Sequence, residues 1–411
     1  MKKLVTLLLA VLMIVGIFAG CSTGSKDQAA TKPAETDATT PADTTDTADT
    51  TDTADEATSG TTFGIEPMAN DITLSLGYFS GAMHALPFYV MEQEGWLDEL
   101  GISFNYQSFI NGPAMMEANA DWDIASTGGP GAITGILGYD IKVIGIADKE
   151  AVLNLYVRED SPIYQAGKGH FADYPKMYGT VETWKGTEWL IPVGTTMHQT
   201  LVTILGQIGL TADDVTMTNM DVTTALTAFK TGAGDGLAVW TSTAIEAEQE
   251  GYIKVAGADD NGVVVPTTVL ATDAALADAV KYEAICKVWE LYFRALDFIE
   301  ADLEKAAQYY ADTCSIEGVS GADDYDLCYE CLSRFNPYGL DSELELMRTY
   351  SADPAGLASR ELSGGEIDLF NTLDFFISQD KYTAADRNTI IDNNKVVSTV
   401  ADSVMASIES R

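Results

Sequence analysis

The chain has 411 residues, with 23 Lys and Arg against 62 Asp and Glu, and a formal net charge of −39. This length is enough for two or three domains, and an apolar content of 46% is enough for large cores. Residues 22–70 contribute only −8 of the charge, so the rest of the chain is itself strongly acidic. Such a field repels nucleic acid and anionic lipid surfaces, and it excludes a nucleic-acid-binding role.

The N-terminus has the pattern of an export signal. Two lysines precede an apolar run over residues 4–18, which is short for a membrane span. The sequence Phe18-Ala19-Gly20-Cys21 resembles the lipobox of bacterial lipoproteins, with Phe where Leu is usual. The resemblance implies that residues 1–20 are a signal peptide and that Cys21 is lipidated, for example with palmitate. A plain signal peptide with an incidental Cys is the alternative.

A Thr/Asp-rich segment follows at residues 21–70. The hexapeptide Thr-Thr-Asp-Thr-Ala-Asp occurs twice in tandem, at 44–49 and 50–55. Its low apolar content cannot offset the chain entropy lost on folding, so we expect a disordered tether that self-repulsion keeps extended. Together with the lipid on Cys21, this predicts a domain held on the extracytoplasmic face of the cell membrane.

Four further cysteines lie in the C-terminal third of the chain: Cys286, Cys314, Cys328 and Cys331. The last two form a C-x-x-C, but no second pair and no nearby His completes a zinc site, so we expect no metal and no cofactor. Their helical spacing on an apolar face favours buried core cysteines. A disulfide from Cys314 to Cys328 or Cys331 is the alternative in an exported protein.

From residue 71 the chain alternates strands and helices, which predicts an α/β architecture with largely parallel strands. The first unit, expected over 71–185, has strands at 72–78, 102–109, 122–126, 142–147 and 152–158, and helices at 87–94, 113–120 and 132–137. A Gly-, Pro- and Tyr-rich loop at about 160–186 interrupts the pattern.

A second α/β unit, expected over 186–262, is short enough to be an insertion into the first. Its strands are at 188–193, 215–220, 236–240 and 253–256, and its helices at 196–209, 222–231 and 243–250. After Pro266 the chain is expected to be chiefly helical, so that 263–411 returns to the first lobe and continues as a helical tail. One long helix there has a core-facing stripe made of Ile285, Val288, Trp289, Tyr292, Leu296 and Ile299.

Four turns of small residues lead from a strand into a helix: 78–82, 127–131, 194–196 and 240–243. Each leaves the first N–H groups of its helix unpaired within that helix, and such ends favour anions or polar acceptors. Two turns from each lobe would form a ligand cage across a cleft. Thr196 and Gln199 also have the spacing of a capping box.

The candidate ligand-binding residues at these turns are Tyr78, Phe79, Ser80, His84, Thr127, Gly128, Thr195, Thr196, His198 and Trp240. His198, at a helix start, would donate to a ligand oxygen, and Trp240 would wall the pocket. For each of them a capping or core role is the alternative. The sequence has no nucleophile elbow, no H-E-x-x-H, no Walker loop and no G-x-G-x-x-G after a strand, so we assign no catalytic residue.

Three stretches resemble the solute-binding proteins of ABC importers for nitrate, sulfonates, taurine and thiamine precursors. They are Gly112-Pro-Ala-Met-Met-Glu-Ala-Asn-Ala-Asp-Trp-Asp-Ile124 with Thr127-Gly128 and Ile133, Val193-Gly-Thr-Thr-Met-His198 with Leu201, Leu205 and Gly209-Leu210, and Ala225 to Trp240 with Gly234-Asp235. By position, the resemblance carries ligand contacts onto Thr127, Gly128, Thr195, Thr196, His198 and Trp240. The turn from Ser80 to His84 matches no motif of the family.

The resemblance implies an α/β, two-lobed type II periplasmic-binding-protein fold. The sequence departs from the family in its Asp/Thr tether, its acidity and its long C-terminal helical extension. The resemblance also implies a monomer that takes a small solute, such as a sulfonate, nitrate or taurine, in the cleft between the lobes and delivers it to an ABC permease. No bond would be made or broken, so we expect no enzyme. The alternatives are an enzyme on the same fold, similar to a thiamine-precursor synthase, and a sensor or adhesin lobe. The acidity favours a zwitterionic or weakly charged solute.

Overall fold

A computed structural model describes residues 62–79, 81–150, 152–317 and 324–411. The predicted signal peptide, Cys21 and the tether as far as residue 61 lie outside these ranges. The expected tether nevertheless extends too far, because residues 62–70 belong to the folded part. A short 3-10 helix, η1 (Thr62–Gly64), leads into Ile65 and Met68, which are buried in the core, and Phe63 packs edge-on against Trp96 with ring centroids 4.9 Å apart. Apolar side chains in an otherwise polar segment explain the difference.

The first lobe contains a five-stranded sheet in the order β2-β1-β3-β10-β4. Its strands are β1 (Ile72–Phe79), β2 (Ile102–Phe109), β3 (Ile124–Gly128), β4 (Ile141–Lys149) and β10 (Pro266–Thr272). β1 is parallel to β2 and β3, whereas β10 runs antiparallel to β3 and β4. All residues of β3 and β10 are buried, as expected for central strands covered on both faces.

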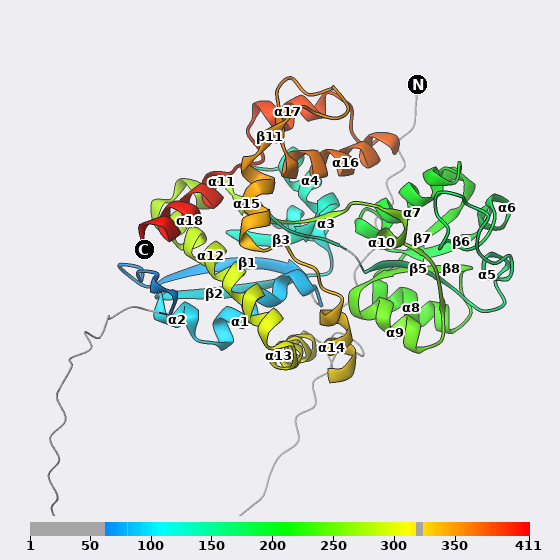
Figure 1. Cartoon of the computed structure of the whole chain (residues 1–411), viewed down its shortest axis with the longest axis horizontal. Helices are drawn as coiled ribbons and strands as arrows, with labels where there is room; N and C mark the ends of the chain where they lie inside the picture. The colour runs from blue at the N-terminus through cyan, green and yellow to red at the C-terminus, as the bar shows by residue number, and fades with distance from the viewer. Residues whose placement is uncertain (1–61, 80, 151, 318–323) are drawn as a thin grey trace, which may run out of the picture. The chain divides into compact units, whose positions relative to one another are not determined.

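The second lobe contains a sheet in the order β7-β6-β8-β5-β9 (Figure 1). Its strands are β5 (Leu153–Val157), β6 (Glu188–Ile191), β7 (Thr216–Asn219), β8 (Gly236–Trp240) and β9 (Ile253–Gly257). β6 is parallel to β7 and β8, and β5 is antiparallel to β8 and β9. Trp184 and Trp189 stack in the core of this lobe with centroids 5.3 Å apart.

Three expectations about the sheets are corrected. The strand at 152–158 does not continue the first sheet, because β5 pairs with β8 and β9 in the second. This placement favours a second lobe that begins near Val152 rather than at residue 186. The first sheet also takes in β10, a strand missed after Pro266, and both sheets are mixed rather than largely parallel. Each missed feature is a pairing between segments distant in the sequence, which local periodicity does not report.

The helices alternate with these strands. In the first lobe they are η2 (Met83–Ala85), α1 (Leu86–Gln93), α2 (Trp96–Glu99), α3 (Gly112–Glu117) and α4 (Gly129–Gly138). In the second they are α5 (Pro162–Gln165), α6 (Val181–Trp184), α7 (Thr196–Gln207), η3 (Ala212–Asp214), α8 (Val222–Lys230), α9 (Thr241–Gln249) and α10 (Ala258–Asn261).

The C-terminal part is chiefly helical, as predicted. It contains α11 (Asp273–Ala277), α12 (Ala279–Ala301), α13 (Leu303–Ile316), α14 (Tyr325–Ser333), α15 (Leu340–Arg348), α16 (Gly364–Ser378), α17 (Asp386–Asp392) and α18 (Thr399–Ser410), with the two-residue strands β11 (Tyr350–Ser351) and β12 (Leu362–Ser363). The predicted stripe of α12 is buried and packs on α1 and β1. α14 and α16 also reach the second lobe, where they contact α9 and α7 (Figure 1). No helix in the described part of the chain has the length and apolar character needed to cross a bilayer.

Candidate functional site

A cavity of about 660 Å³ lies where strands of both sheets end. The first lobe contributes residues after β1 and β2, and the second contributes the turns after β6, β7 and β8. The lining residues are Phe79, Gly81, Ser108, Phe109, Ile110, Asn111, Pro192, Val193, Asn219, Met220, Asp221, Val222, Thr223, Thr224, Trp240, Ser242, Thr243 and Glu317. Crevices at strand ends are where α/β proteins bind ligands.

Two aromatic side chains from opposite lobes line this cavity and lie close to one another. Phe79 at the end of β1 and Trp240 at the end of β8 have ring centroids 6.1 Å apart. Both also line two smaller hollows of about 30 and 20 Å³. The predicted role of Trp240 as a wall is therefore compatible with its position, and Phe79 faces it from the other lobe.

The turns after β3 and β6 meet directly. A Cβ atom placed on Gly128 would lie 2.4 Å from Cγ2 of Thr196 and 2.5 Å from Oε1 of Glu150. The starts of α4 and α7 therefore abut, and the hollow that Thr127, Gly128, Thr195 and Thr196 line holds only about 20 Å³. These four predicted residues are brought together, but they form a contact between the lobes beside the large cavity.

The predicted capping box at the start of α7 is wrong. The residue before the helix is Thr195, whose hydroxyl donates to the Pro192 carbonyl at 2.6 Å, and Gln199 donates its side-chain N–H to the Val264 carbonyl at 3.4 Å. Shifting the helix start by one residue removes the required spacing.

Neither histidine of the predicted set lines the large cavity. The ring of His84 is buried, its Nδ1 lies 2.5 Å from the Ser126 hydroxyl, and burial lowers its pKa to about 3. His198 accepts the Gly194 N–H at Nδ1, 3.2 Å away, and packs edge-on against Phe375 of α16. Burial and then the Lys381 charge lower the pKa of His198 to about 4. Both rings are neutral at pH 7.

Tyr78 is not among the residues that line the large cavity. Its hydroxyl donates to the carboxylate of Glu317, and it lines a neighbouring hollow of about 480 Å³ with Tyr89 and Tyr106. Ser80 and Cys21 lie outside the described residues. Where β1 ends, the described residues that line the cavity are therefore Phe79 and Gly81.

The charged side chains of the cavity are acidic. Among the described lining residues these are Asp221 and Glu317, with no Lys, Arg or His. Asp221 is exposed and caps α8 by accepting the Thr224 N–H at 3.0 Å. Partial burial of the carboxyl group acts to raise its pKa. The hydrogen bonds from Thr224 outweigh that effect, so the pKa of Asp221 is lowered. Glu317 accepts the Ser108 hydroxyl at 2.7 Å, and burial raises its pKa. Sequence reasoning missed both, because acidic residues are abundant throughout the chain.

Two chain crossings connect the lobes, between β4 and β5 and between β9 and β10. They are bonded to one another by the Glu150 N–H, which donates to the Val265 carbonyl at 2.9 Å. Burial raises the pKa of Asp148 to about 6, and burial followed by repulsion from Asp148 raises that of Glu150 well above its usual value. The crossings are short and carry two carboxyl groups, of which Asp148 is buried and Glu150 is half-buried.

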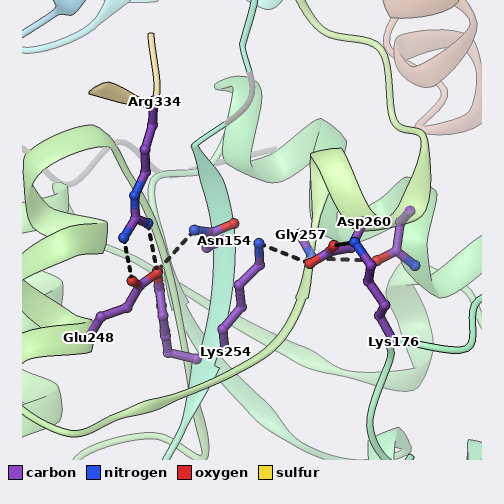
Figure 2. A network of polar contacts seen from close by, with 9 residues as sticks. Asn154, Lys176, Glu248, Lys254, Gly257, Asp260 and Arg334 are labelled. Carbon is purple, nitrogen blue, oxygen red and sulfur yellow. Dashed lines mark hydrogen bonds and ion pairs between the residues drawn. The ribbon is translucent and has the colours of Figure 1, made fainter. Parts of the chain in front are cut away.

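A salt bridge joins the helical extension to the second lobe (Figure 2). Arg334, which ends α14, donates from Nη1 and Nη2 to the carboxylate of Glu248 on α9, at 3.3 and 3.0 Å. The same carboxylate accepts the Tyr156 hydroxyl at 2.7 Å. Further along Figure 2, Asp260 pairs with Lys176 and Lys254 inside the second lobe.

The cysteines have core positions. Cys314, Cys328 and Cys331 are buried where α13 packs on α14, in agreement with the core interpretation, and Cys286 on α12 is half-buried. Within the described ranges no group of acidic, Cys or His side chains is arranged to hold a metal ion.

No protein-family model matches the chain, but individual known proteins resemble it in sequence. A candidate binding protein of Brucella abortus is 23% identical over 258 residues, which are 61% of this chain and 74% of that protein, and one of Brucella suis matches equally.

Several solved structures share the fold of this chain. The aliphatic sulphonate binding protein SsuA of Escherichia coli superposes with a TM-score of 0.52 and 21% identity, over 64% of this chain and 84% of that one. The alkanesulfonate-binding protein SsuA of Xanthomonas axonopodis, bound to MOPS, gives 0.56 and 19% over 76% and 95%. A Candida albicans protein described as having the generic periplasmic-binding-protein fold gives 0.52 and 12% over 79% and 96%. The resemblance drawn from the motifs is thereby confirmed at the level of the fold, and this chain has the two-lobed α/β fold of the periplasmic binding proteins.

Proposed function

We propose that this chain is an extracytoplasmic solute-binding lipoprotein of an ABC importer. It captures a small organic solute in the cavity between its lobes and delivers the solute to a membrane permease. The observation that carries this proposal is the cavity of about 660 Å³ lined from both lobes by strand-end turns. That volume lies within the usual range of about 300–1,000 Å³ for small-molecule sites.

The connection between the lobes supports capture by closure. Two short crossings, bonded to one another through Glu150 and Val265, form a hinge of the kind that closes domains around ligands. Phe79 and Trp240 come from opposite lobes, lie close to one another and both line the cavity, so a solute bound beside them would contact an aromatic ring from each lobe. The sulfonate-binding proteins that share the fold are consistent with this role.

An enzyme on the same fold is the first alternative. Among the described residues that line the large cavity there is no Cys and no His, so neither a Ser–His nor a Cys–His pair is present there. A sensor or adhesin lobe is the second alternative, and it would bind a solute in the same cavity without passing it to a permease.

The test of capture is ligand-dependent stabilisation of the purified protein. We expect at least one compound among sulfonates, nitrate, taurine, pyrimidines and aromatic acids, extended by organic ammonium compounds, to raise the melting temperature. Trp240→Ala should abolish the rise, whereas Tyr350→Ala, which alters an exposed aromatic residue on β11, should preserve it. Turnover of a bound compound would show an enzyme instead. Absence of uptake by vesicles containing the cognate permease would favour the sensor.

Anchoring has a separate test. Cys21→Ser should move the chain from the membrane fraction to the soluble fraction and remove incorporation of labelled palmitate. A variant that stays in the membrane fraction without incorporating lipid would contradict the proposed anchor.

A further inference from the structure

We infer that the solute held in this cavity carries a positively charged ammonium group, whether as an organic cation or as part of a zwitterion. The inference rests on the proposed function, because it concerns the same cavity. It departs from the sulfonate anions named for the proteins that share the fold. It follows from the charges, the aromatic walls and the helix starts around the cavity.

The first observation is the sign of the charge contributed by each lobe. Glu317, at the end of the first-lobe helix α13, and Asp221, before α8 in the second lobe, both line the cavity. No basic side chain lines it among the residues that the structure describes. A cation between two carboxylates from opposite lobes would be attracted to both of them, and would therefore favour closure. A sulfonate in the same place would be repelled by both.

The second observation is the aromatic lining. Phe79 and Trp240 form a tilted pair 6.1 Å apart, and Phe109 at the end of β2 lines the same cavity. The face of an aromatic ring attracts an ammonium group, and recognition of quaternary ammonium by such rings is well established. Aromatic rings and carboxylates together therefore form a site complementary to an alkylated ammonium ion.

The third observation is that most helix N-termini around the cavity, which could otherwise bind an anion, already have a side-chain cap or pack against another helix. Asp221 itself accepts the N–H of Thr224 at the start of α8, and Asn111 accepts the N–H of Ala114 in α3 at 3.0 Å. The starts of α4 and α7 abut through Gly128 and Thr196, which leaves no room for a solute between them. Among the described helices that line the cavity, α9 alone presents a start with neither a side-chain cap nor this contact. One such start could hold the carboxylate of a zwitterion.

The charge of the whole chain acts in the same direction. A net charge of −39 raises the concentration of small cations near the surface and lowers that of anions. Long-range steering, which opposes capture of a sulfonate, thus assists capture of an ammonium compound. The effect should weaken as ionic strength rises, because salt screens exposed charges over roughly 10 Å.

The experiment compares compounds of matched shape by calorimetric titration of the full chain. Choline, glycine betaine and putrescine supply ammonium groups, 3,3-dimethyl-1-butanol replaces the choline nitrogen with carbon, and ethanesulfonate and nitrate supply anions. We expect at least one ammonium compound to bind, and the neutral analogue to bind about tenfold more weakly than choline where choline binds. Asp221→Asn, which keeps an oxygen to cap α8, should weaken binding about fivefold. Asp213→Asn, at an exposed acidic residue of η3, is the matched control and should change nothing.

The outcomes separate the two proposals. Binding of ethanesulfonate or nitrate without binding of any ammonium compound overturns the inference but leaves solute capture standing. Equal affinity for choline and its neutral analogue also overturns it. If no compound of either charge binds, the ammonium inference fails, and solute capture is then decided by the wider set of compounds in the melting-temperature test. Glu317→Gln combined with Asp221→Asn should weaken ammonium binding further than either change alone.

Discussion

The buried carboxyl group of Glu343 makes the stability of this fold depend on pH. Glu343 lies on α15 against β4, and its side chain has no exposed surface. Neither of its carboxyl oxygens has a hydrogen-bond partner among the described residues. Burial raises its pKa to about 8 from the ordinary 4.5, and the nearby Ile146 amide offsets this only in part. The group is therefore protonated in the folded protein at neutral pH.

The sign of the effect follows from proton linkage. Between pH 4.5 and pH 8 the unfolded chain releases the Glu343 proton while the folded chain keeps it, so the free energy of unfolding falls as pH rises. Each pH unit costs about 1.4 kcal/mol, which gives a cost of about 3 kcal/mol at pH 7. Glu343→Gln removes this titration. We therefore compare the difference in unfolding free energy between the variant and the unmodified chain at two pH values. This difference should favour the variant by about 3 kcal/mol more at pH 7 than at pH 4.

Urea unfolding of both proteins at pH 4, 5.5, 7 and 8.5 measures this difference. Glu345→Gln changes an exposed residue of the same helix and should give a difference that does not depend on pH. A pH-independent difference for Glu343→Gln as well would refute the reasoning, since it would mean that the group ionises in the folded state as readily as in the unfolded chain.

Two other predictions concern contacts of the second lobe. Arg334→Gln removes a partly exposed pair and should cost about 1 kcal/mol in urea unfolding, whereas Glu248→Ala should cost about 2–3 kcal/mol, because it also leaves the Tyr156 hydroxyl without its acceptor. Equal losses of unfolding free energy for the two variants would mean that the hydrogen bond from Tyr156 to Glu248 does not contribute to stability. Gly128→Ala places a Cβ 2.4 Å from Thr196 and should hold the lobes apart. Overpacking of about 1–3 kcal/mol corresponds to a loss of solute affinity of about 5- to 150-fold. Gly138→Ala, at the far end of the helix α4 that follows Gly128, meets nothing within 4 Å and is the control. An unchanged affinity for Gly128→Ala would show that capture does not need this contact.

The sequence predicted most elements because their signals are local. The stripe of α12 has the period of a helix, and Trp289 and Tyr292 on it are buried as expected. The turns after β3, β6 and β8 lead into α4, α7 and α9, because small residues and a change of period mark each transition. Motifs with these turns were enough to indicate the fold that the solved structures confirm.

Pairing over long distances was not predictable in the same way. β10 is a fully buried strand, yet its place between β3 and β4 depends on partners more than a hundred residues away in the sequence. Likewise, β5 looks like the next strand of the first sheet until its pairing with β8 places it in the second. Hydrophobic pattern specifies that a segment is a strand, but the sheet it joins is decided by packing of the whole chain.

Sequence and tertiary structure also determine different aspects of the acidic charge of this chain. By itself the sequence determines that the chain is strongly acidic, carries an export pattern and repels polyanions, since these properties depend only on the residues present. The tertiary structure decides where the charge acts. It brings Asp221 and Glu317, which are 96 positions apart, to one cavity beside Phe79 and Trp240, and it buries the carboxyl group of Glu343. The physical reason is that the effect of a charge depends on the distance to other groups and on its exposure to water, and both are set by folding.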